Sequence, residues 1–313
     1  MTNEIAKNIA ALDLGSNSFH LLVASIKSGK IQILHREKHL LRLSGIGDNY
    51  VIDEEKINEA ILIISHFVTE CEKYSAFINA VATSAFRDAE NKNELISRIK
   101  NETGVTVKII SGEEEAELAL LSLKYSIKKL PQKFLLFDLG GGSTEFIFVE
   151  NDRIIKKFSL QLGAVRFAKK YCDSEGNIIY KEKFVSEIKK GVKDVKDFLN
   201  DKNEFECYGM GGTVSAITNM IEAKNLKKQV KFEKLKGCSF TKTENKLLIE
   251  IVSQANTLEK KKNIVGLENS RADIISIGLL ILDVFFTELN ISKVTFSGSG
   301  LREGILLQSF DSD

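Results

Sequence analysis

The chain has 313 residues, 43% of them hydrophobic and 28% charged, an ordinary balance for a water-soluble protein of about two domains. Its net charge of +1 argues against a broad nucleic-acid-binding surface, and no apolar run approaches the roughly 20 residues of a membrane helix. The four cysteines lack paired spacing, which disfavours zinc and disulfide frameworks. The acidic start, unlike a secretory signal, leads us to expect a cytoplasmic protein with no membrane partner.

The first predicted element is a hairpin with a polar turn. Ile9–Leu14 is an apolar strand with Asp13 near its end, and a second apolar run covers Phe19–Ile26. The turn between them contains Gly15, Ser16, Asn17 and Ser18. Glycine lets backbone N–H groups approach an anion, and a nearby carboxylate can hold a hard cation such as Mg²⁺. The pattern therefore indicates a phosphate site, although plain hairpin turns also favour glycine.

Alternating strands and helices follow this hairpin. A strand at 31–34 leads into the mixed-charge segment 35–39 and a turn-rich loop, Gly45–Asn49. Asp53 can cap a helix over Glu54–Lys73 that carries an apolar stripe. Further on, the pattern predicts a strand at 80–83, a helix near 91–103 and a strand at 105–110. This alternation predicts an α/β domain with a central sheet.

A run of three glutamates begins the next helix, which we expect over Glu113–Tyr125 as the link between two lobes. Ser111 or Gly112 can serve as the N-cap, and acids in a first helical turn are favoured by the helix dipole. A purely structural role is therefore a strong alternative to catalysis for these acids.

The hairpin pattern then occurs a second time, in Phe134–Phe148. Asp138 lies 125 residues after Asp13 and is followed by Gly140, Gly141, Gly142, Ser143, Thr144 and Glu145, then by a second apolar strand. A spacing this large is that of a domain. We therefore predict two similar lobes that present their turns to a shared cleft and clamp a phosphate between them.

The remaining chain continues the second lobe. Gly211, Gly212 and Thr213 open a helix and form another candidate anion site, although close packing also calls for glycine. The alternating lysines and acids of a predicted helix at 182–199 indicate a solvent-exposed face. A second Lys-rich stretch, 222–236, is predicted to be a loop or a frayed helix. An apolar helix at 274–289 precedes a final helix from about residue 301.

The ordered set of motifs resembles the exopolyphosphatase / guanosine pentaphosphate phosphohydrolase family. The motifs are Asp13–Ser18, Ala82–Arg87, Ser111–Ala116, Asp138–Glu145, Gly209–Thr213, Arg271–Asp273 and Ser297–Gly304. The resemblance implies an actin-like ATPase fold with two ribonuclease-H-like lobes around a cleft. It implies lobes at 1–126 and 127–300, with segment 301–313 packing back on the first lobe, a short form without further C-terminal domains, and a homodimer.

The resemblance also implies residue roles. It maps the catalytic glutamate to Glu114, with Glu113 as the rival, and Arg87 to a phosphate-neutralising group. Asp138 and Glu145 map to the acids that position Mg²⁺ and the attacking water, and Asp13 is a further metal candidate. The other phosphate-binding candidates are the turn residues Gly15, Ser16, Asn17, Ser18, Gly140, Gly141, Gly142, Ser143 and Thr144, and the helix start Gly211, Gly212 and Thr213.

These assignments predict an Mg²⁺-dependent phosphoanhydride hydrolase. Its expected substrate is inorganic polyphosphate or guanosine pentaphosphate, with no nucleic-acid partner. A kinase or chaperone-like ATPase of the same fold is one alternative, because fold alone does not fix activity. An alarmone-binding protein with little turnover is another, and the acids at Glu114, Asp138 and Glu145 disfavour it.

Overall fold

The computed structural model describes residues 8–27, 30–43, 50–202, 204–226, 228 and 230–311. The turn-rich loop Gly45–Asn49 and the last two residues of the predicted 301–313 segment lie outside the described residues. The chain divides into two compact units. The first runs to Ser122 and includes the segment from Leu301 onward, and the second runs from Leu123 to Gly300.

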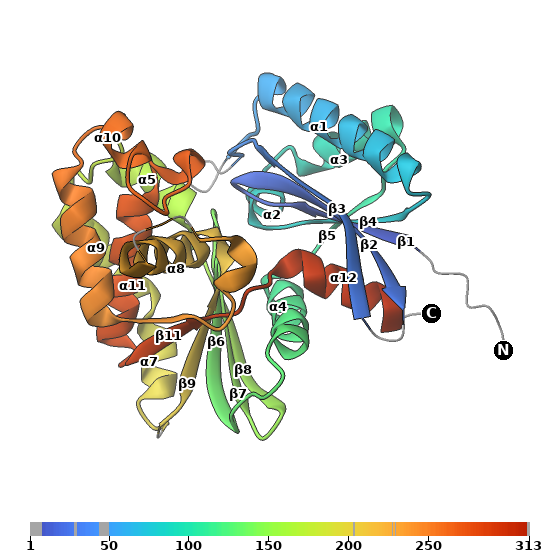
Figure 1. The fold of residues 1–313 in the computed structure, drawn as a ribbon. Helices are drawn as coiled ribbons and strands as arrows, with labels where there is room; N and C mark the ends of the chain where they lie inside the picture. The colour runs from blue at the N-terminus through green and yellow to red at the C-terminus, as the bar shows by residue number, and fades with distance from the viewer. Residues whose placement is uncertain are drawn as a thin grey trace. The chain divides into compact units, whose positions relative to one another are not determined.

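The first unit is built on a five-stranded mixed sheet in the order β3-β2-β1-β4-β5 (Figure 1). The first three strands pair antiparallel, and β4 and β5 continue the sheet in parallel with β1. The strands are β1 (Asn8–Leu14), β2 (Ser18–Lys27), β3 (Lys30–Leu40), β4 (Phe77–Ala82) and β5 (Val107–Ile109). The helices are α1 (Glu54–Lys73), α2 (Ser84–Asp88), α3 (Lys92–Thr103), α4 (Gly112–Ser126, up to Ser122 in this unit) and α12 (Leu301–Asp311).

The two faces of this sheet bury different helices, because successive side chains of a strand point to opposite faces. Leu12 and its even-numbered neighbours on β1 join a core with Phe67 of α1. Ile9 and Ala11 join a second core with residues of α4 and α12. The same alternation places Asp13 on the α4 and α12 face of the sheet.

The second unit has a six-stranded mixed sheet in the order β10-β11-β9-β6-β7-β8. Its strands are β6 (Lys133–Leu139), β7 (Thr144–Glu150), β8 (Arg153–Leu160), β9 (Glu206–Met210), β10 (Ser239–Thr241) and β11 (Lys293–Phe296). Its helices are α5 (Ala164–Tyr171), α6 (Lys181–Gly191), α7 (Lys193–Leu199), α8 (Gly211–Leu226), α9 (Lys242–Gln254), α10 (Leu258–Lys262) and α11 (Ile275–Glu288). The Lys-rich helix expected at 182–199 is thus two helices, with Val192 between them. None of the helices in the described part of the chain is both long and apolar enough to cross a bilayer.

The apolar helix α11 and the aromatic side chains of β6 and β7 fill the core of the second unit. Phe285 of α11 packs edge-on against Phe137 and Phe146, with ring centroids 5.7 and 5.2 Å away. This buried aromatic cluster fixes the strand that delivers Asp138 to its turn.

The first two strands of each unit repeat one another residue by residue. Asp13 pairs with His20 across β1 and β2, and Asp138 pairs with Glu145 across β6 and β7, the same register 125 residues later. The pairing with the third strand shifts register between Val23 and Ala24, and again at the equivalent step in the second unit. The structure confirms the repeat predicted from the sequence, and its two mixed sheets with helices confirm the predicted α/β fold.

Candidate functional site

The first polar turn is held by the Ala82–Arg87 motif. The amide of Gly15 donates to Ser18 O at 3.2 Å and closes the turn. Ser16 Oγ lies 2.7 Å from Ser84 Oγ and accepts a hydrogen bond from Ala85 N at 3.1 Å. Within the described residues, the backbone amides of Ser16 and Asn17 donate to no acceptor. The turn is therefore fixed while two of its donors stay available, as the phosphate-binding interpretation requires.

Asn17 anchors this turn through its backbone oxygen and also presents a side-chain amide. Its backbone oxygen accepts from Leu41 N and Arg42 N at 3.1 and 3.0 Å, which ties the turn to the end of β3. The residue is only 8% exposed, and its side-chain amide has no hydrogen-bond partner among the described residues. A buried polar group without a partner costs about 1–3 kcal/mol, which favours a role in binding a ligand.

Asp13 interacts electrostatically with charged groups of α4 and α12. Burial raises its pKa to about 7, and the charge of Arg302 on α12 opposes that rise. Negative charge from Glu115 and Glu303 raises the pKa further. Asp13 is therefore close to Glu115 on α4 and to the first residues of α12, on the sheet face that the strand alternation indicates.

Glu115 is the buried glutamate of the predicted acidic run. It is 8% exposed, and its Oε2 lies 2.9 Å from Nη1 of Arg87, which also donates to Ile110 O at 2.8 Å. Burial raises the pKa of Glu115, and the charge and hydrogen bond of Arg87 oppose that rise. The structure thus brings Glu115, Arg87 and Asp13 into one cluster.

Glu114, the residue predicted to be catalytic, takes part in capping α4. Its carboxylate accepts from Ser111 N at 2.8 Å, and its own amide donates to Ser111 Oγ at 3.1 Å, which together form a capping box. Its side chain is 43% exposed and lies 2.7 Å from Lys108 Nζ, whose hydrogen bond lowers the pKa of Glu114. The rival Glu113 is exposed. The sequence analysis did not single out Glu115, although the Ser-x-x-Glu spacing from Ser111 is that of a capping box at Glu114.

The second polar turn is held by the start of α5. Its glycine carbonyls accept from Ala164 N, Val165 N and Arg166 N at 2.9–3.0 Å, and Gly142 O also accepts from Arg166 Nε at 2.9 Å. A Cβ at Gly163 would lie 2.3 Å from Gly141 O, so this close approach requires glycine. In the part of the chain that the structure describes, the amides of Gly141 and Gly142 donate no hydrogen bond, and they remain available to an anion.

The second turn also contains two hydroxyl residues. Ser143 and Thr144 are both buried, and Thr144 Oγ1 donates to Leu162 O. The hydroxyl of Thr144 therefore anchors the turn to the chain before α5. This role comes from a contact across the second unit, which the local sequence does not reveal.

Two carboxylates lie side by side at the second turn. Asp138 and Glu145 are paired across β6 and β7, and neighbouring residues of such a pair project from one face. Ser159 Oγ donates to Glu145 Oε1 at 2.9 Å, and Glu145 is almost fully buried. Mg²⁺ takes one or two carboxylates together with phosphate oxygens and water. The oxygen donors of Asp138 and Glu145 fit that requirement in the second unit, and Asp13 offers an equivalent carboxylate in the first.

The start of α8 packs against this pair. Gly211 has a left-handed φ of +88°, and a Cβ there would lie 2.7 Å from Asp138 Oδ1. A Cβ at Gly212 would lie 1.5 Å from Nη2 of Arg271, so the guanidinium rests on this glycine. The structure thus brings Asp138, Gly211, Gly212 and Arg271 together.

Thr213 differs from the two glycines before it. The residue is buried, and a Cβ at Gly278 of α11 would lie 2.3 Å from Thr213 Cγ2. The Thr213 methyl group therefore fills a contact between α8 and α11, which is a packing role.

Comparison with known proteins supports the resemblance noted above. The model of the Ppx/GppA phosphatase family matches residues 22–313. An exopolyphosphatase structure from Cytophaga hutchinsonii ATCC 33406 is 24% identical, covers 98% of both chains and has a TM-score of 0.88. A Ppx/GppA family member from Aquifex aeolicus is 25% identical over 98% of both chains, with a TM-score of 0.79. The Aquifex aeolicus PPX-GPPA enzyme is 26% identical, covering 96% of this chain and 99% of that chain, with a TM-score of 0.76.

Proposed function

The chain belongs to the Ppx/GppA phosphatase family, and from that premise we propose a Mg²⁺-dependent phosphoanhydride hydrolase that releases the terminal orthophosphate of polyphosphate. The observation that carries the proposal is the cluster of Glu115, Arg87 and Asp13 beside a turn with available amide donors. Hydrolysis of a phosphoanhydride is largely a matter of positioning and of neutralising charge. The cluster and the two turns supply groups of both kinds.

Each of the two turns offers hydrogen-bond donors to phosphate oxygens. The amides of Ser16 and Asn17 in the first unit, and of Gly141 and Gly142 in the second, donate to phosphate oxygens. The side-chain amide of Asn17, which has no hydrogen-bond partner among the described residues, donates to the phosphate held by the first turn. These donors are held rigidly, because Ser84 and Ala85 fix the first turn and the start of α5 fixes the second.

Glu115 is the proposed general base. A carboxylate whose pKa is raised by burial is better matched to accepting a proton near neutral pH than an exposed one. Arg87 holds Glu115 Oε2 and orients the carboxylate toward the attacking water. Glu114 keeps its structural role at the start of α4 in this proposal.

Asp138 and Glu145 are the proposed ligands of the Mg²⁺ ion. When bound, the ion supplies positive charge against the phosphate oxygens. The contribution of the chain is to hold two carboxylates together, with Glu145 fixed by Ser159 and Asp138 lying against Gly211.

Guanosine pentaphosphate is the second candidate substrate, because it ends in the same terminal phosphoanhydride. The test is phosphate release by the purified protein from long polyphosphate, short polyphosphate and guanosine pentaphosphate, each with Mg²⁺ and with a chelator. Mg²⁺-dependent release of orthophosphate without an acceptor supports the proposal.

Each competing function has its own result in this assay. Phosphate transfer only in the presence of an acceptor would indicate a kinase. ATP hydrolysis without polyphosphate hydrolysis would indicate a chaperone-like ATPase, and guanosine pentaphosphate binding without turnover would indicate an alarmone-binding protein.

A further inference from the structure

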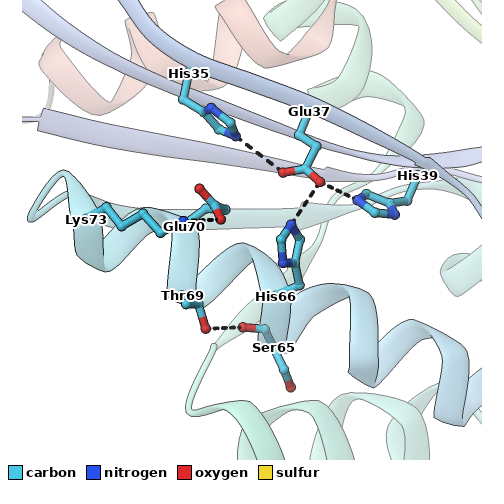
Figure 2. Close-up of polar contacts among 8 residues, drawn as sticks. All are labelled: His35, Glu37, His39, Ser65, His66, Thr69, Glu70 and Lys73. Carbon is cyan, nitrogen blue, oxygen red and sulfur yellow. Dashed lines mark hydrogen bonds and ion pairs between the residues drawn. The ribbon is translucent and has the colours of Figure 1, made fainter.

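Three of the four histidines of the chain surround one carboxylate in the first unit. His35, Glu37 and His39 alternate along β3, so all three project from the same face of the strand. His66 approaches from α1, and Figure 2 shows the rings of all three histidines directed at the Glu37 carboxylate. Nε2 of His39 and of His66 lie 2.6 and 2.9 Å from Glu37 Oε1, and Nε2 of His35 lies 3.3 Å from Oε2.

The donor atoms are close enough to bind one ion together. One ligand atom each from Glu37, His39 and His66 lies within 4.8 Å of the others. A tetrahedral ion with bonds of about 2.0–2.2 Å holds its donors roughly 3.3 Å apart, so small side-chain rotations suffice. The three side chains are 24–45% exposed, which lets an ion enter and leaves a position for water.

The charge of the cluster also suits a cation. The Glu37 carboxylate lies between the three imidazole rings and supplies the anionic ligand of the cluster. Glu70 of α1 lies nearby, and its carboxylate forms an ion pair with Lys73 (Figure 2).

We propose that Glu37, His39 and His66 form a binding site for a transition-metal ion of the Zn²⁺ class, with His35 hydrogen-bonded to its carboxylate. Imidazole nitrogens with a carboxylate suit Zn²⁺, Cu²⁺ and Ni²⁺, whereas Mg²⁺ and Ca²⁺ prefer oxygen ligands alone. This site is chemically distinct from the carboxylate pair of Asp138 and Glu145.

The position of the proposed metal site in the fold indicates a structural role for the ion. β3 is the edge strand of the first sheet, and the ion would join it to α1. Leu41 and Arg42, directly after β3, hold the backbone oxygen of Asn17 in the first polar turn. A metal ion at this site therefore secures the edge strand that leads into the Asn17 contact.

The test is calorimetric titration of Zn²⁺ into the chelator-treated full-length protein with excess Mg²⁺ present. All proteins carry Cys172→Ser and Cys238→Ser, which removes the two partly exposed thiols as competing ligands. We expect one equivalent of Zn²⁺ to bind, with about 100-fold or greater loss of affinity in His39→Ala and in His66→Ala. Arg36→Ala is the matched control, because this strand neighbour projects from the opposite face and should leave Zn²⁺ binding unchanged.

Two further readouts guard against an indirect effect of the substitutions. Circular dichroism checks that each variant is folded. Zn²⁺ should raise the thermal midpoint of the parent and of Arg36→Ala, but not of His39→Ala or His66→Ala. Absence of Zn²⁺ binding in the parent would overturn the proposal. So would a Zn²⁺ affinity in the folded His39→Ala and His66→Ala variants equal to that of the parent.

Discussion

The two hairpins share one backbone and differ in chemistry. Each closes with a hydrogen bond from the turn glycine to the fourth residue, Gly15 N to Ser18 O at 3.2 Å and Gly140 N to Ser143 O at 3.0 Å. Opposite the aspartate, however, the first hairpin has His20 and the second has Glu145. The same frame thus places one carboxylate near Glu115 and Arg302, and the other beside a second carboxylate. The difference teaches that one repeated backbone can place its aspartate in two different electrostatic settings, and in our proposal only the second copy carries a pair of cation ligands.

Glu145→Gln tests the second carboxylate, which only the second hairpin has. Removing one of two proposed Mg²⁺ ligands should raise the Mg²⁺ concentration needed for half-maximal phosphate release by about 10- to 100-fold. His20→Gln, at the equivalent register of the first hairpin, should leave that Mg²⁺ requirement unchanged whatever it does to kcat. Equal Mg²⁺ requirements in Glu145→Gln and the parent would remove Glu145 from the cation site.

Gly163→Ala tests how the second turn is held. Its Cβ would lie 2.3 Å from Gly141 O, so the start of α5 must move away from the turn, at a cost of about 1–3 kcal/mol. We expect lower phosphate release together with a lower free energy of unfolding. Gly104→Ala is the control for stability, because its left-handed φ of +73° costs about 1–2 kcal/mol while nothing lies near the added Cβ. An activity loss of the same size in both variants would show that stability alone is responsible.

Asn17→Ala tests the donor that is special to the first turn. Loss of one hydrogen bond to the substrate should raise KM by about 3- to 10-fold with little change in kcat. Its free energy of unfolding, measured in urea, should not fall by more than about 1 kcal/mol, because the side chain has no partner to lose among the described residues. An unchanged KM would exclude Asn17 from substrate binding.

Asp13→Asn should change the pH dependence of stability. The pKa of Asp13 is about 7 in the folded protein and about 3.9 in an unfolded chain. Between these values the folded state holds a proton that the unfolded state releases, so this group makes stability fall as pH rises. The contribution is greatest below pH 4 and is lost by about pH 7. Urea unfolding from pH 5 to 8, without Mg²⁺ or substrate, should therefore show a shallower decline in Asp13→Asn, and parallel curves would contradict the raised pKa.

The hairpins were predictable because their signals are local. An apolar strand, an acid, glycines and a second strand specify a turn without distant contacts, and the repetition at Asp138 identifies two related units. Glu115 was harder to choose, since three consecutive glutamates satisfy the same motif. The phase of α4 buries Glu115 and leaves Glu114 at the cap, where its carboxylate accepts a hydrogen bond from Ser111 N.

The features that could not be predicted from the sequence depend on contacts between segments far apart in the chain. Arg271 meets Gly212 only in the folded second unit, and Thr213 packs on Gly278 of another helix. The mixed-charge segment of β3 likewise gains its candidate metal site only when α1 brings His66 to Glu37. The spacing of residues along the sequence does not show which of these distant side chains come into contact.

The most direct test of the central claim compares Glu115→Gln with Glu114→Gln in phosphate release from polyphosphate with saturating Mg²⁺. Loss of the general base should lower kcat of Glu115→Gln by about 10²–10⁴-fold, with KM nearly unchanged. Glu114→Gln should keep kcat near the parent value, because its carboxylate caps α4. Normal turnover by Glu115→Gln, or collapse of kcat in Glu114→Gln with its fold intact, would contradict the account.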